Sequence, residues 1–420
     1  MVTSIEARSG ELTPAEVAQT LAQGFANVAL DGGRALVIIP DGTRTAPIPL
    51  LFALLGATLG ARVAALDYLI ALGTHPPMAE EAIDALVGVS AAERARRYPG
   101  VRIFNHQWDH PDQLARIGVI SRDEATALSD GLLTEEIPVT LNRLLLDYDH
   151  IIICGPVFPH EVAGFSGGAK YLFPGVAGPD IINFTHWLGA LVTSMATIGV
   201  KDTPVRRVIH RAAAFVPRPI TCVALVMHGS DFQGLYIGSY EEAFAAAADQ
   251  SARLNIIYKP HPFRSVLSAP AERYDDLWTA AKAMYKTEPV VADGGEVIIY
   301  APHISEVSYT HGALIDEVGY HVRDYFLGQW PRFAQVPGMI LAHSTHVRGA
   351  GTYDVASGVE RPRIQVTLAT NIPAERCARI NLGYRDYRTL DPRNWADREG
   401  DGLLLVEHAG ETLYRLREPA

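Results

Sequence analysis

The chain is organised around Gly155-Pro-Val-Phe-Pro-His-Glu-Val-Ala-Gly-Phe-Ser-Gly-Gly-Ala-Lys-Tyr-Leu-Phe-Pro-Gly175. This stretch follows a short apolar run, Asp149 to Gly155, which is typical of a buried strand that opens onto a loop. Gly167 and Gly168 can adopt backbone angles closed to other residues, and they let backbone N–H groups approach an anion closely. Lys170 adds a positive charge or a nucleophilic amine beside that turn, so the stretch predicts a cofactor site.

The loop differs from the Walker phosphate loop of nucleotide triphosphatases. Ala169 separates the glycine pair from Lys170, and Tyr171 stands where the Ser or Thr of that loop would hold Mg²⁺. The remaining alternative is a Gly-rich structural turn with a solvated Lys. His160 before Lys170 and His186 after it favour a functional site once the rest of the chain is considered.

Length and composition indicate an ordinary globular protein with two domains. The 420 residues exceed what one hydrophobic core usually supports, and the chain is 48% hydrophobic and 20% charged. A formal net charge of −11 argues against a nucleic-acid partner. Cys154, Cys222 and Cys377 lie far apart without C-x-x-C spacing, which indicates neither a zinc site nor a disulfide framework.

The sequence also predicts where the protein works. The first ten residues contain no apolar run behind a basic start, so we expect no signal peptide. No uncharged apolar stretch reaches membrane-spanning length, so we expect no membrane partner. A cytoplasmic location is the simplest expectation.

The first half of the chain repeats a pattern of strand, polar turn and helix. Ala35 to Asp41 predicts a strand that ends in a polar turn, and Val63 to Leu72 predicts the next strand. Ligands gather at the carboxyl ends of strands in parallel α/β sheets. Arg44 and His75 follow these two strands at equivalent positions, and the guanidinium of Arg44 is well shaped to bind a carboxylate or phosphate.

We therefore predict an α/β protein of two domains, each a mixed or mostly parallel sheet with flanking helices, with the active site in the cleft between them. The N-terminal domain is expected over residues 1–262 and the C-terminal domain over 268–402, with a hinge at the two prolines of Tyr258–Phe263. Strands over 403–406 and 412–416 should form a hairpin in a tail, 403–420, that returns to the first domain. In the second domain we predict a helix over 274–285 and strands over 339–342 and 364–370.

The assembled motifs resemble the lactate racemase family, the enzymes that carry a nickel-pincer nucleotide. The resemblance covers nearly the whole chain and is most specific between Asp41 and His186. It rests on five motifs that occur in the family's order: Asp41-Gly-Thr-Arg44, Gly73-Thr-His75, Pro159-His160, Ala163 to Lys170, and His186.

The resemblance implies a covalently held cofactor. Lys170 would bond to the thio-acyl group of the nickel-pincer nucleotide, and the imidazole of His186 would coordinate nickel beside the pincer's sulfur and carbon donors. Gly167 and Gly168 would contact the cofactor, as would Asp41 and Thr43 at the first strand end, although Asp41 could instead orient Arg44 or contact the substrate. Dedicated biosynthetic enzymes that make this cofactor are the implied protein partners.

The resemblance also implies an isomerase that inverts the α-carbon of a 2-hydroxy acid. His75 and His160 would be the acid/base pair, because the hydroxyl groups of the two enantiomers present themselves on opposite sides. As one imidazole removes the hydroxyl proton, the α-hydrogen would leave as hydride to the cofactor and produce a 2-keto acid, which is then reduced on its other face.

Substrate contacts are implied for Arg44 and Lys282, which would anchor the carboxylate, and for Trp278 and Thr279. The family's lactate enzymes favour a Gln where this chain has Thr279, and a shorter side chain would reshape the pocket. The substrate is therefore expected to be a 2-hydroxy acid that need not be lactate. A core position is the alternative interpretation of Trp278.

Two other functions compete with a racemase. A protein that binds the nickel-pincer cofactor without turnover would not need both His75 and His160. A nicotinamide-dependent 2-hydroxyacid dehydrogenase would need a G-x-G-x-x-G turn after a strand, with an acidic residue about twenty positions later. The stretch from Gly164 to Ala169 does not have that spacing.

Overall fold

The computed structural model describes residues 2–417, and contacts within the chain divide it into two compact units. Unit 1 runs to Phe158 and includes Phe165–Thr185 and Lys201–Leu254. Unit 2 consists of Pro159–Gly164, His186–Val200 and the chain from Asn255 onward. Two short segments of the first half of the sequence therefore cluster with the second half, where the sequence suggested a single boundary.

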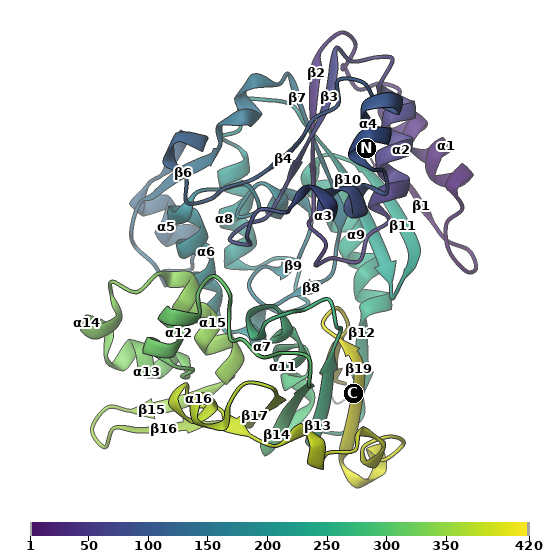
Figure 1. Ribbon diagram of the computed structural model, residues 1–420. Coiled ribbons are helices and arrows are strands. Elements are labelled where there is room, and N and C mark those ends of the chain that lie inside the picture. The colour runs from purple at the N-terminus through teal and green to yellow at the C-terminus, as the bar shows by residue number, and fades with distance from the viewer. Residues whose placement is uncertain (1, 418–420) are drawn as a thin grey trace. The chain divides into compact units, whose positions relative to one another are not determined.

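Unit 1 is built on a seven-stranded sheet in the order β1-β11-β10-β7-β2-β3-β4 (Figure 1). The strands from β10 to β4 are parallel, while β11 runs antiparallel to β10 and to β1. The mostly parallel sheet predicted from the sequence is confirmed. The strands are β1 (Thr3–Glu6), β2 (Arg34–Ile39), β3 (Ala65–Ile70), β4 (Ile103–Asn105), β7 (His150–Pro156), β10 (Ile220–His228) and β11 (Asp231–Gly238).

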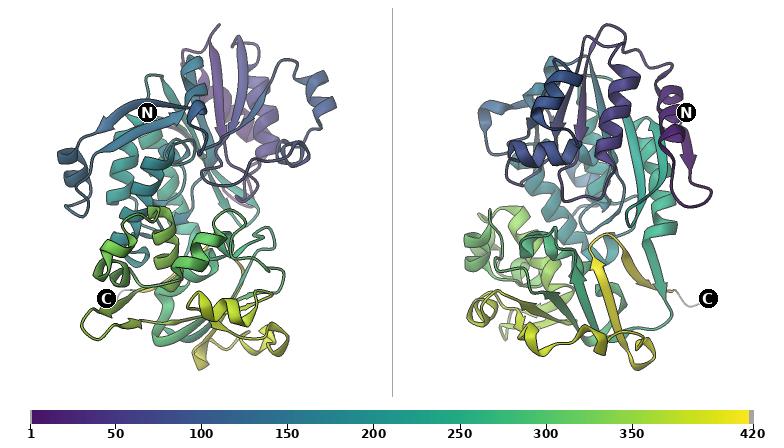
Figure 2. Two further views of the ribbon diagram at one scale, coloured as in Figure 1. Left: turned by 60° about the vertical axis from the view of Figure 1, so that its left-hand side comes forward. Right: turned by 45° about the vertical axis from the view of Figure 1, so that its right-hand side comes forward.

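Helices cover both faces of this sheet, as Figures 1 and 2 show. Every residue of β2 from Ala35 to Ile39 is buried, and such near-continuous apolar runs are typical of strands covered on both faces. On one face the strands pack against α1 (Pro14–Phe25), α2 (Ile48–Leu59) and α3 (Glu80–Val87). The sequence between β4 and β12 includes the further helices α5 (Arg122–Leu128), α8 (Pro204–Ala213) and α9 (Tyr240–Asn255).

Local signals set the ends of these helices. Thr13 and Glu16 form a capping box at the start of α1, with Pro14 in the first turn. Thr203 caps α8 by accepting a hydrogen bond from the backbone N–H of Arg206, and Pro204 opens that helix.

Unit 2 contains a five-stranded sheet in the order β18-β17-β14-β13-β19, in which all neighbours are parallel. A parallel sheet was expected here too, and the prediction is confirmed. Its strands are β13 (Phe263–Pro270), β14 (Val291–Ala301), β17 (Gln365–Thr370), β18 (Gly383–Tyr384) and β19 (Leu403–Ala409), and it carries the helices α10 (Leu277–Ala280), α11 (Lys282–Tyr285) and α15 (Gly338–Arg348).

Three local predictions in this half are wrong. Residues 339–342, predicted as a strand, form part of α15, whose residues from Met339 to Arg348 are all buried. A helix without an exposed face has no polar stripe, so its apolar run resembles a strand. The helix predicted over 274–285 is instead two short helices, α10 and α11, that meet at Ala281.

The third error concerns the tail. β19 and β20 (Leu413–Leu416) do not pair with each other: β19 pairs with β13, and β20 pairs in parallel with β12 (Ile256–Lys259). Both pairings lie in unit 2, so the tail adds strands there in place of the expected hairpin.

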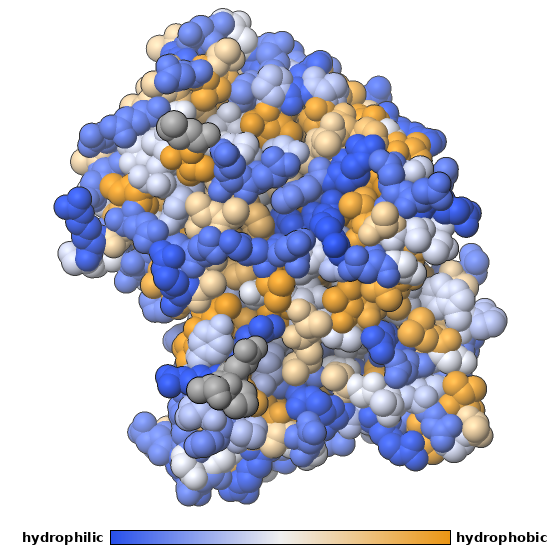
Figure 3. Space-filling view, turned by 180° about the vertical axis from the view of Figure 1, so that it is seen from behind, coloured by the Kyte–Doolittle hydropathy of each residue, from blue (hydrophilic) through white to orange (hydrophobic). Residues whose placement is uncertain are grey.

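The surface is that of an ordinary globular protein. On the face shown in Figure 3, charged and polar residues are interspersed with small groups of apolar ones. Within residues 2–417, no helix is long and apolar enough to cross a membrane.

Candidate active-site residues in each unit

Asp41 and His75 meet at the carboxyl ends of two neighbouring parallel strands of unit 1. β2 and β3 end side by side, with Ile39 opposite Ile70, and the two residues lie in the loops that follow. Nδ1 of His75 is 2.5 Å from Oδ2 of Asp41. The other carboxylate oxygen, Oδ1, accepts hydrogen bonds from the backbone N–H of Thr43 at 3.1 Å and from its hydroxyl at 2.6 Å. The carboxylate is therefore held on both sides.

The charge of Asp41 decides which nitrogen of His75 carries the proton. Burial by itself would raise the pKa of Asp41, but the imidazole of His75, the guanidinium of Arg44 and the hydroxyl of Thr43 outweigh it and hold the pKa well below its usual range. An ionised carboxylate can only accept hydrogen bonds, so the proton lies on Nδ1 of His75. Nε2 of the neutral ring then presents a lone pair, as a general base requires.

The Gly-rich loop after β7 is fixed by close packing. Gly167 and Gly168 have φ values of +84° and +58°, which only glycine adopts without strain. A Cβ at Gly167 would lie 2.5 Å from a methyl carbon of Val157, and one at Gly168 would lie 2.8 Å from Cβ of Phe244. Both positions thus require glycine, because protein atoms fill the space that a side chain would occupy.

Arg206 of α8 anchors the same loop, and the sequence analysis assigned it no role. Its guanidinium donates to the carbonyl of Gly167 at 3.0 Å and to the carbonyl of Phe165. It also lies 4.0 Å from the centroid of the Phe244 ring. The side chain is buried, and burial lowers its pKa to about 9. A cation that binds two loop carbonyls stabilises the conformation that precedes Lys170.

Lys170 lies in a short 3₁₀ turn, Gly168–Tyr171, directly after that loop. Its backbone N–H donates to the carbonyl of Gly167 at 3.3 Å, and its carbonyl accepts from Gly175 at 3.1 Å. The side chain is half-buried. The turn therefore presents an amine on a defined backbone, as covalent attachment of a cofactor requires.

His186, the predicted nickel ligand, is half-buried on α6 (Pro179–Val192). Among residues 2–417, no three His, Cys, Asp or Glu side chains gather in a way that could hold a metal ion. A protein-only metal site would need such a group.

His160 has a different environment from His75. It lies in the two-residue strand β8 (Pro159–His160) of unit 2 and is 8% exposed. Nδ1 of His160 accepts a hydrogen bond from the backbone N–H of Val162 at 3.1 Å. The carboxylate of Glu161 lies beside the same nitrogen, with Oε2 at 3.6 Å. The buried ammonium of Lys286 donates to the carbonyl of Pro159 and, at 3.2 Å, to that of Glu411.

Lys282 and Thr279, two of the predicted substrate contacts, are buried in unit 2. Nζ of Lys282 donates to the carbonyl of Thr279 at 3.0 Å and lies 4.7 Å from the centroid of the Tyr274 ring. The hydroxyl of Thr279 donates to Oδ1 of Asp276 at 2.9 Å, and Asp276 caps α10. Thr279 thus uses its hydroxyl within its own helix, and the ammonium of Lys282 lies close to the same short helix.

Trp278 is half-buried and packs against two imidazoles that the sequence analysis overlooked. Its ring lies 4.1 Å from that of His343 and 4.6 Å from that of His311, centroid to centroid. Burial lowers the pKa of His343 well below its usual value, and nearby Lys282 and His186 contribute. His343 and His346 lie three residues apart, which is helical spacing, but the strand predicted at 339–342 obscured it.

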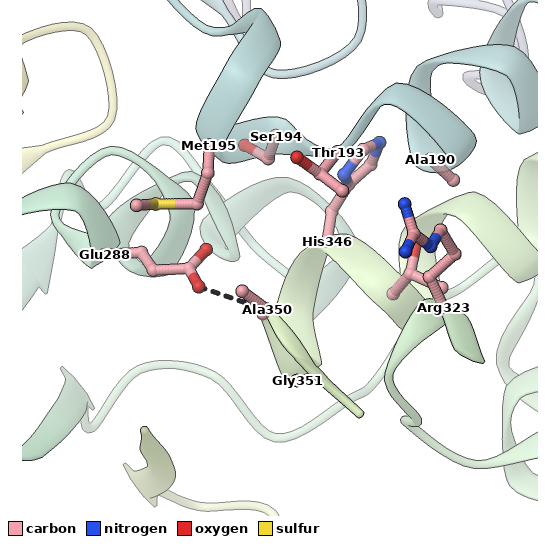
Figure 4. Close-up of a pocket in the computed structure, with 11 residues that line it drawn as sticks. Ala190, Thr193, Ser194, Met195, Glu288, Arg323, His346, Ala350 and Gly351 are labelled. Carbon is pink, nitrogen blue, oxygen red and sulfur yellow. Dashed lines mark hydrogen bonds between the residues drawn. The ribbon is translucent and has the colours of Figure 1, made fainter. Parts of the chain in front are cut away.

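A cavity of about 170 Å³ lies within unit 2 (Figure 4), lined by residues of α6, α15 and the segments next to them. Figure 4 shows the imidazole of His346 beside the side chain of Thr193. The charged groups on its wall already have partners: Arg323 pairs with Asp324 at 2.9 Å, and Glu288 accepts from the backbone N–H of Ala350 at 2.7 Å. The wall therefore favours no particular charge on a bound molecule.

Comparisons with known proteins place these residues in a family context. Residues 15–199 match the lactate racemase N-terminal domain. A curated relative, the lactate racemase of Thermoanaerobacterium thermosaccharolyticum, is 23% identical over 287 residues, which make up 67% of this chain and 61% of that enzyme. The chain thus matches about three-fifths of the length of this relative.

Two solved structures resemble the whole chain. A protein from Thermotoga maritima, determined by the Northeast Structural Genomics Consortium, is 31% identical and superposes with a TM-score of 0.90 over 98% of this chain and 100% of that one. The lactate racemase apoprotein from Thermoanaerobacterium thermosaccharolyticum is 17% identical, with a TM-score of 0.67 over 97% of this chain and 94% of that one. At that identity the second likeness establishes the fold alone.

Proposed function

Because the chain belongs to the lactate racemase family, we propose that it is a racemase or epimerase that inverts the α-carbon of a 2-hydroxy acid. The observation that carries the proposal is the contact of 2.5 Å between Asp41 and His75 at two adjacent strand ends. It prepares an imidazole for proton abstraction, which a protein that only stores a cofactor would not need.

A nickel-pincer nucleotide suits the residues that would hold it. Lys170 offers an amine on a defined turn, Gly167 and Gly168 give the backbone before it its conformation, and His186 offers a single imidazole for nickel. Asp41 and Thr43 bond chiefly to each other and to His75, so we assign them to positioning the base more than to contact with the cofactor. When bound, the cofactor supplies the reversible acceptance of hydride from the α-carbon.

His75 removes the hydroxyl proton of one enantiomer. Its Nδ1–H is bound to Asp41, so Nε2 accepts the proton and the ring becomes an imidazolium whose charge the carboxylate stabilises. In the opposite direction the same Nε2–H returns a proton to the substrate oxygen. Asp41 thus serves both directions by keeping the ring in one orientation.

His160 handles the proton of the other enantiomer. Two bases are needed because inversion moves the hydrogen to the opposite face of a planar 2-keto acid. Arg44 and Lys282 anchor the carboxylate, and that charge pairing fixes which face meets which imidazole. Thr279 is shorter than a Gln, and its hydroxyl is bound to Asp276, so this position offers no amide donor to the substrate. We therefore expect a substrate whose side chain differs from that of lactate.

The test is a screen for optical inversion. Protein produced together with the cofactor's biosynthetic enzymes is given a panel of enantiopure 2-hydroxy acids with small, branched, aromatic and polyhydroxylated side chains, and chiral chromatography follows the opposite enantiomer. We expect inversion of at least one member, its loss on removal of nickel, and no dependence on nicotinamide. Protein that carries nickel and cofactor yet inverts no acid would contradict a racemase and favour a cofactor-binding protein.

A further inference from the structure

The two proposed bases differ in the contacts of their Nδ1 atoms. Nδ1 of His75 faces a carboxylate at 2.5 Å and must carry a proton. Nδ1 of His160 instead accepts the backbone N–H of Val162 at 3.1 Å, so in this geometry it carries none. The neutral ring of His160 therefore has its proton on Nε2, and Nε2 cannot accept another.

This tautomer cannot complete the reaction from His160. If Nε2 gave its only proton to the substrate oxygen, the ring would be left as an imidazolate, which is unfavourable near neutral pH. To act as a base, Nε2 must be free of its proton and Nδ1 must be protonated, so Nδ1–H needs an acceptor. The N–H of Val162 is a donor and cannot serve.

Glu161 offers that acceptor. Its Oε2 lies 3.6 Å from Nδ1 of His160, slightly beyond hydrogen-bonding distance, so a movement of less than about 1 Å would form the bond. The His160 segment is otherwise well anchored, because Lys286 binds the carbonyl of Pro159 on one side. A ring rotation is therefore a smaller change than a movement of the backbone.

Glu161 is also surrounded by charges that keep it ionised. Burial by itself would raise the pKa of Glu161, but Lys282, Lys286 and His346 together lower it below its ordinary value. Besides these three groups, the titratable imidazole of His160 also faces it. An ionised carboxylate among two ammonium groups can accept Nδ1–H without taking the proton itself.

We propose that Glu161 is a positioning residue that accepts the Nδ1 proton of His160 and so converts His160 from a fixed Nε2–H donor into a reversible acid and base. The inference rests on the proposed function, which assigns His160 to proton transfer. The proton balance closes: the base form has Nδ1–H bound to Glu161 and an empty Nε2. Uptake of the hydroxyl proton gives the imidazolium, and its return restores the base form.

The test is the titration of His160 followed by ¹⁵N NMR of histidine-labelled protein, with the His160 signals assigned from their absence in His160→Ala. In the native protein the imidazolium form gains Glu161 as a partner. In Glu161→Gln the pKa of His160 should fall by about one unit or more, because an opposite charge within hydrogen-bonding range is lost. Glu161→Asp should restore part of the shift.

Glu288→Gln is the matched control. Glu288 is also buried in unit 2, but it binds the backbone N–H of Ala350, so its replacement should leave the His160 titration unchanged. An unchanged His160 titration in folded Glu161→Gln would overturn the proposal. If Glu161→Gln fails to fold, Glu161→Met, which also lacks the carboxylate, takes its place, and a His160 titration identical to that of the native protein would overturn the proposal equally.

Kinetics of the cofactor-loaded protein give the second readout. The equilibrium constant of a racemisation is one, so kcat/KM in Glu161→Gln must fall equally from both enantiomers, and we expect a loss of about ten- to a hundred-fold. Glu161→Asp should recover part of it. A native protein that inverts no 2-hydroxy acid would defeat the proposed function, whereas the titration of the unloaded protein would still decide whether Glu161 controls His160.

Discussion

The two histidines proposed for catalysis lie in regions of the molecule built on different principles. In unit 1, His75 sits at the end of a buried parallel strand, and its partner Asp41 sits at the end of the neighbouring one. In unit 2, His160 sits in a two-residue strand, and its Nδ1 contacts Glu161 and Val162, its near neighbours in sequence. The first imidazole is oriented by the sheet and the second by the local chain.

The two arrangements differ in how firmly they fix the tautomer of the imidazole. A carboxylate that also binds Thr43 leaves Asp41 one orientation and His75 one tautomer. A backbone N–H and a carboxylate compete for Nδ1 of His160, so that ring has two accessible states. We therefore expect the base of unit 1 to be permanently set and the base of unit 2 to be switchable.

The largest effect is expected for cofactor attachment, which is assigned to Lys170 of unit 1. Lys170→Ala should remove the cofactor adduct seen by intact-mass measurement of protein produced with the biosynthetic enzymes, because it deletes the attaching amine. His186→Ala should keep adduct but lose nickel, measured by elemental analysis. The control is Lys201→Ala, since Lys201 is exposed and pairs with Asp249 at the surface. An unchanged adduct in Lys170→Ala would remove Lys170 from the account.

A smaller effect is expected when Asp41, the partner of His75, is replaced. Asp41→Asn keeps the size of the side chain but replaces the acceptor of Nδ1–H by an amide that can hold the wrong tautomer of His75. We expect kcat to fall by about a hundred- to ten-thousand-fold with KM changed far less. Asp67→Asn is the matched control: Asp67 is buried in β3 and binds Arg102 and Tyr148, so it should lower thermal stability and leave kcat nearly unchanged.

The smallest expected effect is a pH dependence of stability that comes from His106 and His150, two buried histidines with no proposed role in catalysis. Burial lowers the pKa of His106 and of His150 to about 4 each. Their neutral forms therefore stabilise the fold fully above pH 6.5, and that stability is lost as the pH falls from 6.5 towards 4, where the unfolded chain binds protons first. Protonation of each histidine should lower the free energy of unfolding by on the order of 1–3 kcal/mol between pH 6.5 and 4.

Urea unfolding at several pH values measures this loss. His150→Gln can keep a hydrogen bond to Thr221, which binds Nε2 of His150 at 2.8 Å, and should flatten the dependence between pH 6.5 and 4. The same slope in His150→Gln and in the native protein would show that His150 does not contribute. The activity of the variant should follow the native pH profile, because His150 is proposed to act on stability alone.

The sequence predicted where Asp41 and His75 lie in unit 1, because both residues follow the ends of parallel strands. Apolar runs identified β2 and β3, and parallel strands bring their carboxyl ends together, so Asp41 and His75 were expected at the same edge. Their direct contact could not be predicted, since it depends on the turn that Thr43 closes. Arg206 was missed because a buried cation in a helix with polar neighbours carries no local signal.

Unit 2 was predicted less well, for two physical reasons. α15 is buried along its whole length, so its apolar start resembled a strand and concealed the helical spacing of His343 and His346. Glu161 lies within the stretch from Gly155 to Gly175, yet its relation to Nδ1 of His160 depends on the direction of the Val162 N–H. Such backbone directions cannot be inferred from residue types.

A single-turnover measurement tests the division of labour between His75 and His160 most directly. Cofactor-loaded His75→Ala and His160→Ala are each mixed with one pure enantiomer of an acid that the native protein inverts, and cofactor absorbance and bound 2-keto acid are followed. The account predicts that neither variant racemises and that each oxidises only the enantiomer whose hydroxyl faces its surviving imidazole, with about a hundred- to ten-thousand-fold slower reaction of the other. Equal responses of both variants to both enantiomers, or full racemisation by either variant, would contradict it.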